Sequence, residues 1–279
     1  MFFILSFLPF SYLFYTRLKG IFHKLSWVCL YYVPVVVLYL YFTHGFYDVK
    51  NFIRLFVILC IVDMVYTNGY IQNDVLTTKQ EKNPTIRLPL RLLLTMRSCF
   101  VVIIIGRAML ITFFFIILYY FDESYCFTLG VVMIGLQVLY FVYNSQRSII
   151  NLLLIPLLSF IRFFGIIFAF IDQDPGIVIW LFLLYPFPKF LEFSTQERYI
   201  TARVMKNIIR NFDVFRVVYY LIYTLVVTGV WLQGAIDWII VIMGLYFLCF
   251  RILCLLAITQ ETFSGYIQDL RYKNNPHKK

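Results

Sequence analysis

The sequence predicts an all-α membrane protein, a polytopic helical bundle with eight to nine transmembrane helices. Its composition, its long apolar runs and the distribution of its basic residues all indicate this class. The chain of 279 residues is 62% hydrophobic and only 14% charged, with a mean hydropathy of +0.84. Average soluble domains are about 45–50% apolar and about 25% charged. Because a soluble domain could not bury so much apolar surface, we exclude a soluble enzyme and a disordered chain.

Eight apolar runs are long enough for helices that cross a bilayer, which need about 20 residues each. Helices are required because the hydrocarbon core offers no water to satisfy open backbone groups. The residues before Phe14 are apolar but few, so we expect an interfacial or re-entrant helix there, or a ninth span. The eight predicted spans are Trp27–Thr43, Phe52–Gln72, Ser98–Tyr120, Cys126–Tyr143, Ser148–Ile171, Ile177–Leu191, Val214–Leu232 and Trp238–Ile258.

The basic residues predict the orientation of these spans. Seventeen of them fall on connections of one side, and Lys50 stands alone on the other. Basic connections lie in the cytoplasm, so both termini are expected there, in a bacterial-type inner or plasma membrane, if there are eight spans. This asymmetry explains the net charge of +10 without a nucleic-acid partner. The six cysteines lie mostly within apolar runs and indicate neither a zinc site nor a disulfide framework.

The chain is expected to have three parts: an interfacial N-terminal segment over 1–25, the transmembrane bundle over 26–258 and a basic cytoplasmic tail over 259–279. Two cytoplasmic connections within the bundle, 73–97 and 189–213, are long and chemically mixed. Function on a membrane scaffold concentrates where polar groups do, so these two loops are expected to hold the site. They follow the second and the sixth spans, at matching places in two halves of the chain.

The first of these loops combines oxygen ligands with basic residues. Asn73, Asp74, Thr77 and Glu81 share one face if the helix continues beyond the membrane. Oxygen atoms on one face suit Mg²⁺, especially when phosphate groups complete its coordination. The alternative is a solvated helix end with no ligand. The basic residues that could hold phosphate groups beside such a metal are Lys79, Lys82 and Arg87.

Four ionisable residues fall within predicted spans: Asp63, Arg107, Arg162 and Arg251. A charge at the bilayer centre costs at least about 2.5–3.5 kcal/mol by insertion scales, and such residues face the bundle interior. Asp63 precedes Asp74 by three helical turns, so it could line the same cavity. The alternative is an ion pair between Asp63 and an arginine that only positions helices. Arg251 lies near a predicted cytoplasmic end and can extend to the interface.

The first loop resembles a motif of the UbiA-type intramembrane prenyltransferases. That motif reads Asn-Asp-x-x-Asp-x-x-x-Asp at the end of the second span. Asn73 and Asp74 match its first two positions, and Thr77 and Glu81 stand where the later Asp residues are expected. The stretch from Asn83 to Arg87 approximates the Lys/Asn-Pro-x-Arg-Pro sequence that follows in the family, with one residue inserted.

The second loop is similar to the family's second motif only at its start. Tyr185 and Lys189 fit the Tyr-x-x-x-Lys pair. Two or more Asp at four-residue spacing should follow, but Glu192 and Gln196 hold that spacing here, and Gln is a poor metal ligand. This departure puts the second metal site of the family in doubt.

A third likeness is to the branch of the family that uses polyprenyl phosphates. That branch has Tyr, a polar residue eleven positions later and Arg eleven positions beyond. Tyr140, Asn151 and Arg162 stand at these intervals, and Gly165 follows shortly after.

The resemblance implies a UbiA-like bundle that opens to the cytoplasm and binds a prenyl (di)phosphate lipid. It also implies Mg²⁺-dependent transfer of a prenyl or phosphosugar group. The implied catalytic residues are Asp74, Arg162 and Lys189. The implied metal ligands are Asn73, Asp74, Glu81 and Glu192. The substrate-binding residues expected from the resemblance and from the intramembrane charges are Asn73, Lys79, Arg87, Tyr185, Arg198 and Asp63.

A second interpretation stays open, because both loops have lost carboxylates. The chain would then be a catalytically inactive UbiA-fold scaffold, or an accessory subunit of a membrane protein complex, with partner proteins in place of a substrate. The retained Asn73 and Asp74 favour the transferase, and the missing Asp residues favour the scaffold. A transporter is less expected, since no pair of Pro/Gly-interrupted spans indicates a midplane ion site.

Overall fold

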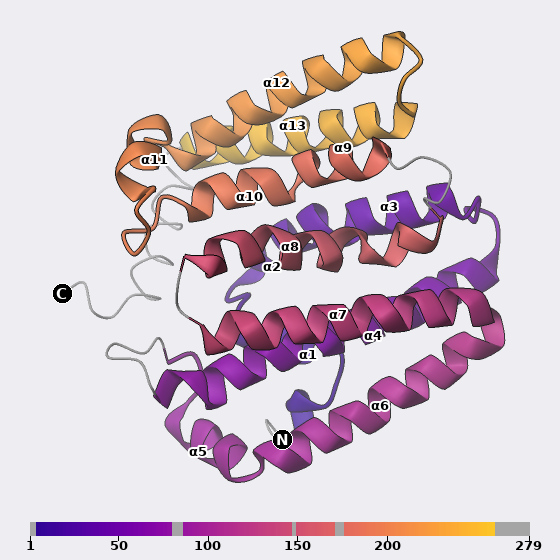
Figure 1. The fold of residues 1–279 in the computed structure, drawn as a ribbon, viewed down its shortest axis with the longest axis vertical. Coiled ribbons are helices and arrows are strands. Elements are labelled where there is room, and N and C mark those ends of the chain that lie inside the picture. The colour runs from indigo at the N-terminus through magenta and orange to yellow at the C-terminus, as the bar shows by residue number, and fades with distance from the viewer. Residues whose placement is uncertain (1–3, 80–85, 147–148, 171–175, 260–279) are drawn as a thin grey trace. The chain divides into compact units, whose positions relative to one another are not determined.

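The structure is a computed structural model that describes residues 4–79, 86–146, 149–170 and 176–259 (Figure 1). Every regular element in these ranges is a helix, which confirms the all-α prediction. The chain divides into two compact units, Met1–Gln173 and Asp174–Lys279, which we call unit 1 and unit 2. The predicted division into N-terminal segment, bundle and tail stays a prediction, and the tail lies almost wholly outside the described residues.

The described residues include six helices that are long and apolar enough to cross a membrane. A seventh crossing results if α9 (Gly176–Leu184) and α10 (Pro186–Phe193), bent by 43°, count as one span. An integral membrane protein is therefore confirmed at this level, while the larger count of eight to nine spans stays a prediction. The six helices are Ile21–Phe42, Phe100–Phe121, Glu123–Ser145, Ile150–Phe168, Phe212–Leu232 and Trp238–Ile258.

The N-terminal residues form short helices instead of a span. The described part of this segment contains η1 (Ile4–Ser6) and α1 (Ser11–Thr16), and neither is long enough to cross a bilayer. The next helix runs from Ile21 to Phe42 as α2 (Ile21–Trp27), a π-helical stretch (η2, Val28–Tyr32) and α3 (Val33–Phe42). The interfacial or re-entrant placement of the N-terminus stays a prediction.

Helix α4 (Val49–Val75) is the central helix of unit 1 and contains the predicted span Phe52–Gln72. It packs against α6 (Phe100–Phe121) and α7 (Glu123–Ser145), as Figure 1 shows. All residues from Val57 to Val65 are buried, which is the pattern of a helix covered on every side. Helix α8 (Ile150–Phe164) packs on α7 and continues into η4 (Gly165–Phe170).

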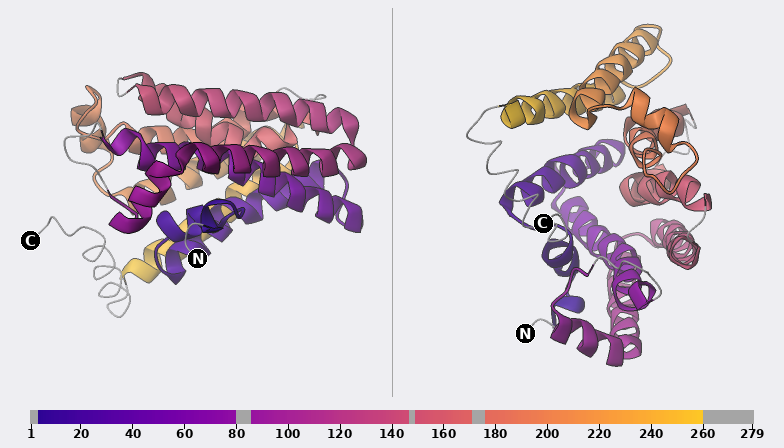
Figure 2. Two further views of the ribbon diagram at one scale, coloured as in Figure 1. Left: turned by 90° about the horizontal axis from the view of Figure 1, so that it is seen from below. Right: turned by 90° about the vertical axis from the view of Figure 1, so that its left-hand side faces the viewer.

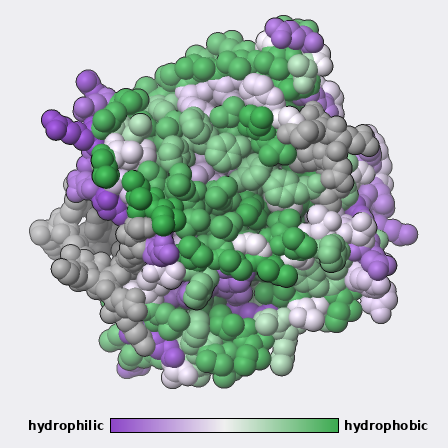
Figure 3. Space-filling model, in the orientation of Figure 1, coloured by the Kyte–Doolittle hydropathy of each residue, from purple (hydrophilic) through white to green (hydrophobic). Residues whose placement is uncertain are grey.

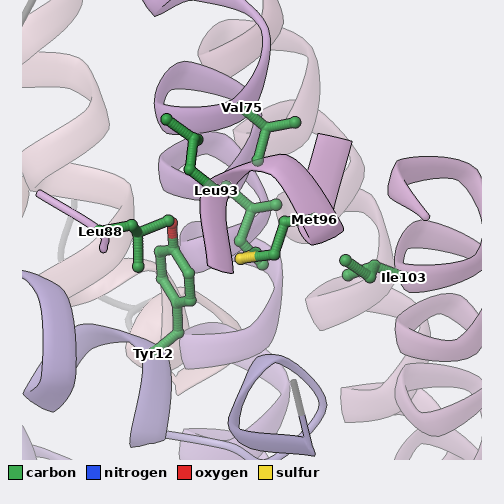
Figure 4. Close-up of a cluster of buried hydrophobic side chains, with 7 residues drawn as sticks. Tyr12, Val75, Leu88, Leu93, Met96 and Ile103 are labelled. Carbon is green, nitrogen blue, oxygen red and sulfur yellow. The ribbon is translucent and has the colours of Figure 1, made fainter. Parts of the chain in front are cut away.

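Helix α4 ends before the position that the predicted metal motif requires. It stops at Val75, and the chain turns through η3 (Thr77–Lys79). The face expected to run on to Glu81 is therefore not continuous, and Glu81 itself lies outside the described residues. The chain returns as α5 (Leu90–Ser98), which packs on the end of α4 through an apolar cluster (Figure 4). The cluster consists of Tyr12, Ile71, Val75, Leu88, Leu93, Met96 and Ile103.

Unit 2 is built around a hairpin of α12 (Phe212–Leu232) and α13 (Trp238–Thr259). Figures 1 and 2 show α12 in orange and α13 in yellow. The Asn211 side chain caps α12 by accepting from the Asp213 amide at 2.9 Å. The turn of the hairpin contains Gly234 at φ +72°, a conformation that favours glycine. Helices α9 and α10 pack beside this hairpin, and α11 (Ala202–Ile208) precedes it.

The surface supports a lipid environment. Figure 3 shows hydrophobic residues over the middle of the face that it presents and hydrophilic residues mainly at its left and right margins. Large apolar side chains on α6 and α7 are widely exposed, among them Met109 at 68% and Ile134 at 68%. Exposed apolar area on this scale marks contact with a membrane or a partner.

Candidate functional site

Asp74, near the end of α4, gathers three side chains from other parts of unit 1. Only 3% of its side chain is exposed. Its Oδ2 accepts a hydrogen bond from the Tyr12 hydroxyl at 2.8 Å. Its Oδ1 accepts from Arg17 Nη2 at 2.9 Å and from Arg87 Nη1 at 3.3 Å. The carboxylate therefore holds the N-terminal segment and the chain after η3 against the same helix end.

Side chains also satisfy the last backbone groups of α4 and so fix the position of Asp74. Thr78 Oγ1 donates to the Asp74 carbonyl at 2.6 Å. Arg97 Nε donates from α5 to the Val75 carbonyl at 3.1 Å. The final carbonyls of a helix have no partner within it, so these contacts stabilise the buried helix end.

Arg17 is held on two sides and retains one free donor. Its guanidinium lies over the Tyr70 ring, with 4.5 Å between Cζ and the ring centroid. Its Nη1 is buried and has no hydrogen-bond partner among the described residues. Burial lowers the pKa of Arg17, but Asp74, Tyr70 and Tyr12 together outweigh this effect and the net pKa is raised. The guanidinium therefore stays charged.

Tyr12 and Arg87 complete the cluster around Asp74. Burial, and then the charge of Asp74, raise the pKa of Tyr12, so its hydroxyl stays protonated and donates. Burial and the charge of Arg17 lower the pKa of Arg87, while Asp74 opposes this shift. Arg87 keeps 32% of its side chain exposed. Two cations and one carboxylate leave the cluster with one net positive charge.

A cavity of about 370 Å³ opens beside this cluster, and every residue that lines it belongs to unit 1. Arg17 and Arg87 lie in its wall, whereas Asp74 does not. Amides and hydroxyls form other parts of the wall, and Ile155 and Leu158 of α8 form an apolar part. The remaining lining residues are Tyr66, Tyr70, Asn73, Tyr140, Tyr143, Asn144 and Ser159.

Tyrosine rings form one wall of the cavity. The Tyr66 ring meets the Tyr70 and Tyr140 rings edge to face, at centroid distances of 5.2 Å and 4.9 Å. Gly69 allows this packing, because a Cβ atom there would lie 2.1 Å from Tyr140 Cδ1. Asn144 of α7 donates to the Gly69 carbonyl at 2.9 Å and fixes the same crossing of α4 and α7.

Arg162 lies directly behind this wall. Its Cζ is 3.8 Å from the Tyr66 centroid, 4.7 Å from the Trp27 ring and 4.9 Å from the Tyr31 ring. Trp27 ends the helical turn before the π-helical stretch, and Tyr31 lies within that stretch. Such π-helical deformations are often found at functional sites. Arg162 is 1% exposed, and its Nε and Nη2 have no hydrogen-bond partner among the described residues. Cation–π contact with three rings therefore stabilises this buried charge.

Asp63 and Arg107 fasten the N-terminal segment inside unit 1. Asp63 Oδ2 accepts from the Phe10 amide at 2.7 Å. Arg107 donates to the Ser6 carbonyl and, at 2.7 Å, to the Met64 carbonyl. The structure gives Asp63 no ion pair among the described residues and does not place it in the cavity wall. Its observed role is to anchor the segment that carries Tyr12 and Arg17.

The structure brings some of the predicted site residues together in unit 1. Asn73, Arg87 and Tyr140 line the cavity, and Asp74 and Arg162 lie behind its wall. Asn151 is buried and donates to the Tyr143 carbonyl at 3.1 Å, next to the cavity. Lys79 ends η3, but nothing is described of its side chain.

The predicted residues of the second loop belong to unit 2. Lys189 donates to Glu192 at 3.1 Å, and Arg216 donates to the same carboxylate at 2.5 Å and 3.0 Å. Tyr185 is buried, with the Lys189 ammonium 6.0 Å from its ring. Arg198 is exposed and lies over the rings of its neighbours in the turn after α10. Lys189, Glu192 and Arg216 form an ion-pair cluster of their own.

The described residues do not fit Mg²⁺ as they stand. Both oxygens of Asp74 accept from cations or a hydroxyl, and both oxygens of Glu192 are bound by Lys189 and Arg216. Over the described ranges, no three His, Cys, Asp or Glu side chains gather as a metal would require. Glu81, the third predicted ligand, falls in a gap of those ranges. A magnesium cofactor therefore stays a prediction.

Sequence reasoning missed the residues that the N-terminal segment contributes. Arg17 counted only toward the charge asymmetry, and Tyr12 only toward an apolar run. Both reach Asp74 from more than 50 positions away, and no local pattern encodes such a contact. A usable signal was Asp74, one of only two acidic residues in a loop with five basic ones, since a buried carboxylate requires partners. No family model, no curated protein and no solved structure matches the chain.

Proposed function

We propose that this membrane protein binds the phosphate end of a prenyl (di)phosphate lipid in the cavity of unit 1. The observation that carries the proposal is Arg17, which lines the cavity and whose buried Nη1 has no acceptor among the described residues. Arg87 lies in the same wall. Two guanidinium groups provide planar, permanently charged donors, and phosphate oxygens accept strong hydrogen bonds from such groups.

The remaining walls suit the other parts of such a lipid. Asn73, Asn144 and Ser159 offer neutral hydrogen-bond groups. Ile155 and Leu158 give an apolar surface to the first carbons of a chain. Ligand sites commonly combine an apolar lining with a few placed polar groups in this way.

Transfer of a prenyl or phosphosugar group is the fuller form of the proposal. Arg17 and Arg87 would stabilise the negative charge that develops on a departing diphosphate. The tyrosine faces at Tyr66, Tyr70 and Tyr140 would stabilise an allylic cation. This proposal includes the UbiA-like assignment, which rests on the likeness of the motifs. It also includes eight spans, with the cavity open to the cytoplasm and both termini there, which rest on the Lys/Arg asymmetry.

A scaffold without catalysis is the second candidate function. The observation that favours it is the saturation of Asp74 and Glu192 by basic side chains. Such a protein would still bind the lipid but would not turn it over. Product analysis after incubation of the bound lipid with membrane extract separates the two functions.

The binding test compares farnesyl monophosphate with farnesol, which has the same chain without the phosphate. We expect the protein in lipid nanodiscs to bind the phosphate and not the alcohol. Arg87→Ala should weaken this binding about tenfold, because charge-assisted hydrogen bonds are lost. Arg91→Ala is the matched control, since Arg91 is exposed on α5 and does not line the cavity. Equal binding of farnesol, or an unchanged affinity in Arg87→Ala, contradicts the proposal.

A further inference from the structure

The Asp74 carboxylate binds two arginines that line the cavity. It is not part of the cavity wall, whereas Arg17 and Arg87 are. Arg17 uses Nη2 for Asp74, while its buried Nη1 has no hydrogen-bond partner among the described residues. The carboxylate thus lies behind the donors that a ligand would meet.

Three of the roughly four lone-pair sites of Asp74 are engaged. Three donors, one hydroxyl and two guanidinium groups, reach its two oxygens within 3.3 Å. A metal ion at these oxygens would find one unoccupied lone-pair site, on Oδ2, and its positive charge would be repelled by Arg17 and Arg87. An anion in the cavity would instead be attracted by the two arginines that line it.

We propose that Asp74 is a positioning counter-ion that aims Arg17 and Arg87 into the cavity, so that the site binds phosphate without a divalent metal. The inference rests on the proposed function and deepens it. Asp74 orients both guanidinium groups and also reduces their positive charge. Asp74 therefore raises the affinity for an anion by orienting the arginines, and lowers it by offsetting part of their positive charge.

The same carboxylate fastens the segment that supplies Arg17. Tyr12 and Arg17 lie at successive turns of that segment, and both bind Asp74. The segment has two further anchors, at Asp63 and Arg107, that do not involve Asp74. Loss of Asp74 should therefore loosen residues 12–17 more than residues 6–10.

Two substitutions separate the two contributions. Asp74→Asn keeps the size and one acceptor oxygen but removes the charge, so it should bind farnesyl monophosphate about tenfold more tightly than the parent protein. Asp74→Ala removes the acceptor as well, so the arginines are no longer held toward the cavity and binding should weaken about tenfold. Both results are expected in EDTA, without added Mg²⁺. Glu197→Gln is the matched control, because Glu197 is an exposed carboxylate of unit 2 whose ion pair, among the described residues, is with Lys206.

Three outcomes overturn the inference. Loss of binding in Asp74→Asn, or loss of binding of the parent protein in EDTA, means that Asp74 holds a metal. Unchanged affinity in both variants means that Asp74 serves only the fold. If Asp74→Ala does not fold, the sign of the change in Asp74→Asn decides alone.

Hydrogen exchange gives a readout that needs no ligand. Asp74→Ala should raise amide exchange over residues 12–17 at least tenfold, while Asp74→Asn should raise it less. If the parent protein binds neither farnesyl monophosphate nor inorganic phosphate, the proposed function fails. The exchange pattern still tests the positioning of Arg17, and equal exchange in the parent and both variants contradicts that positioning.

Discussion

Two buried arginines at the core of unit 1 are stabilised in different ways. Arg107 is fully buried and donates to Asn68, Ser6, Met64 and Thr67. Arg162 is almost as deeply buried, but aromatic faces surround it and two of its nitrogens have no partner over the described ranges. A buried polar group without a partner costs about 1–3 kcal/mol, so the consequences of removing each cation differ.

Arg107→Met should destabilise the protein by about 3 kcal/mol or more, because it leaves several buried acceptors unpaired. Arg162→Met should cost less, since few hydrogen bonds are lost with it. Thermal unfolding in detergent, followed by tryptophan fluorescence, measures both. Met109→Leu on the exposed face of α6 is the control. Equal losses of stability in the two arginine variants would show that hydrogen bonding does not distinguish the contributions of Arg107 and Arg162.

At the scale of elements, the crossing of α4 and α7 determines the shape of the cavity. Gly69 provides the space for the Tyr140 ring, and Asn144 reaches the Gly69 carbonyl at 2.9 Å. The extent of α4 was close to the predicted span, since a long apolar run is a local property. The expected continuation of the helix to Glu81 is not observed, because α4 ends at Val75, where Arg97 of α5 binds the Val75 carbonyl.

Gly69→Ala should destabilise the α4–α7 contact by about 1–3 kcal/mol, because the new methyl group would overlap the Tyr140 ring. It should also weaken binding of farnesyl monophosphate, since Tyr140 lines the cavity. Gly135→Ala is the matched control on α7, where an added Cβ meets nothing within 4 Å. Its effect should stay within about 1 kcal/mol. Wild-type stability and binding in Gly69→Ala would show that the ring moves aside freely.

At the scale of the whole molecule, the two predicted loops are distributed over two units. The motif likeness placed both loops around one metal site, yet all residues that line the described cavity belong to unit 1. The carboxylate of the second loop, Glu192, forms ion pairs within unit 2. The membrane character and the helical class are properties of the whole chain, and both were predicted from composition.

The orientation in the membrane is testable with two single cysteines. In a background without the native cysteines, Tyr47→Cys should react with a membrane-impermeant maleimide from outside the cell. Ile200→Cys should react only after the membrane is permeabilised, because it lies among basic residues that favour the cytoplasm. Both positions are suitable, with Tyr47 101% and Ile200 88% exposed. The reverse pattern of labelling would invert the predicted topology.

The sequence by itself determined the helical membrane class and the approximate extents of most long helices. Apolar runs and their lengths act locally, and the hydrocarbon core admits little besides helices. Tertiary structure alone decided the environment of Asp74, because its partners Tyr12, Arg17 and Arg87 come from different segments. Whether a carboxylate binds a metal or an arginine depends on which cations the fold brings within about 3 Å, and spacing along the chain does not encode that distance.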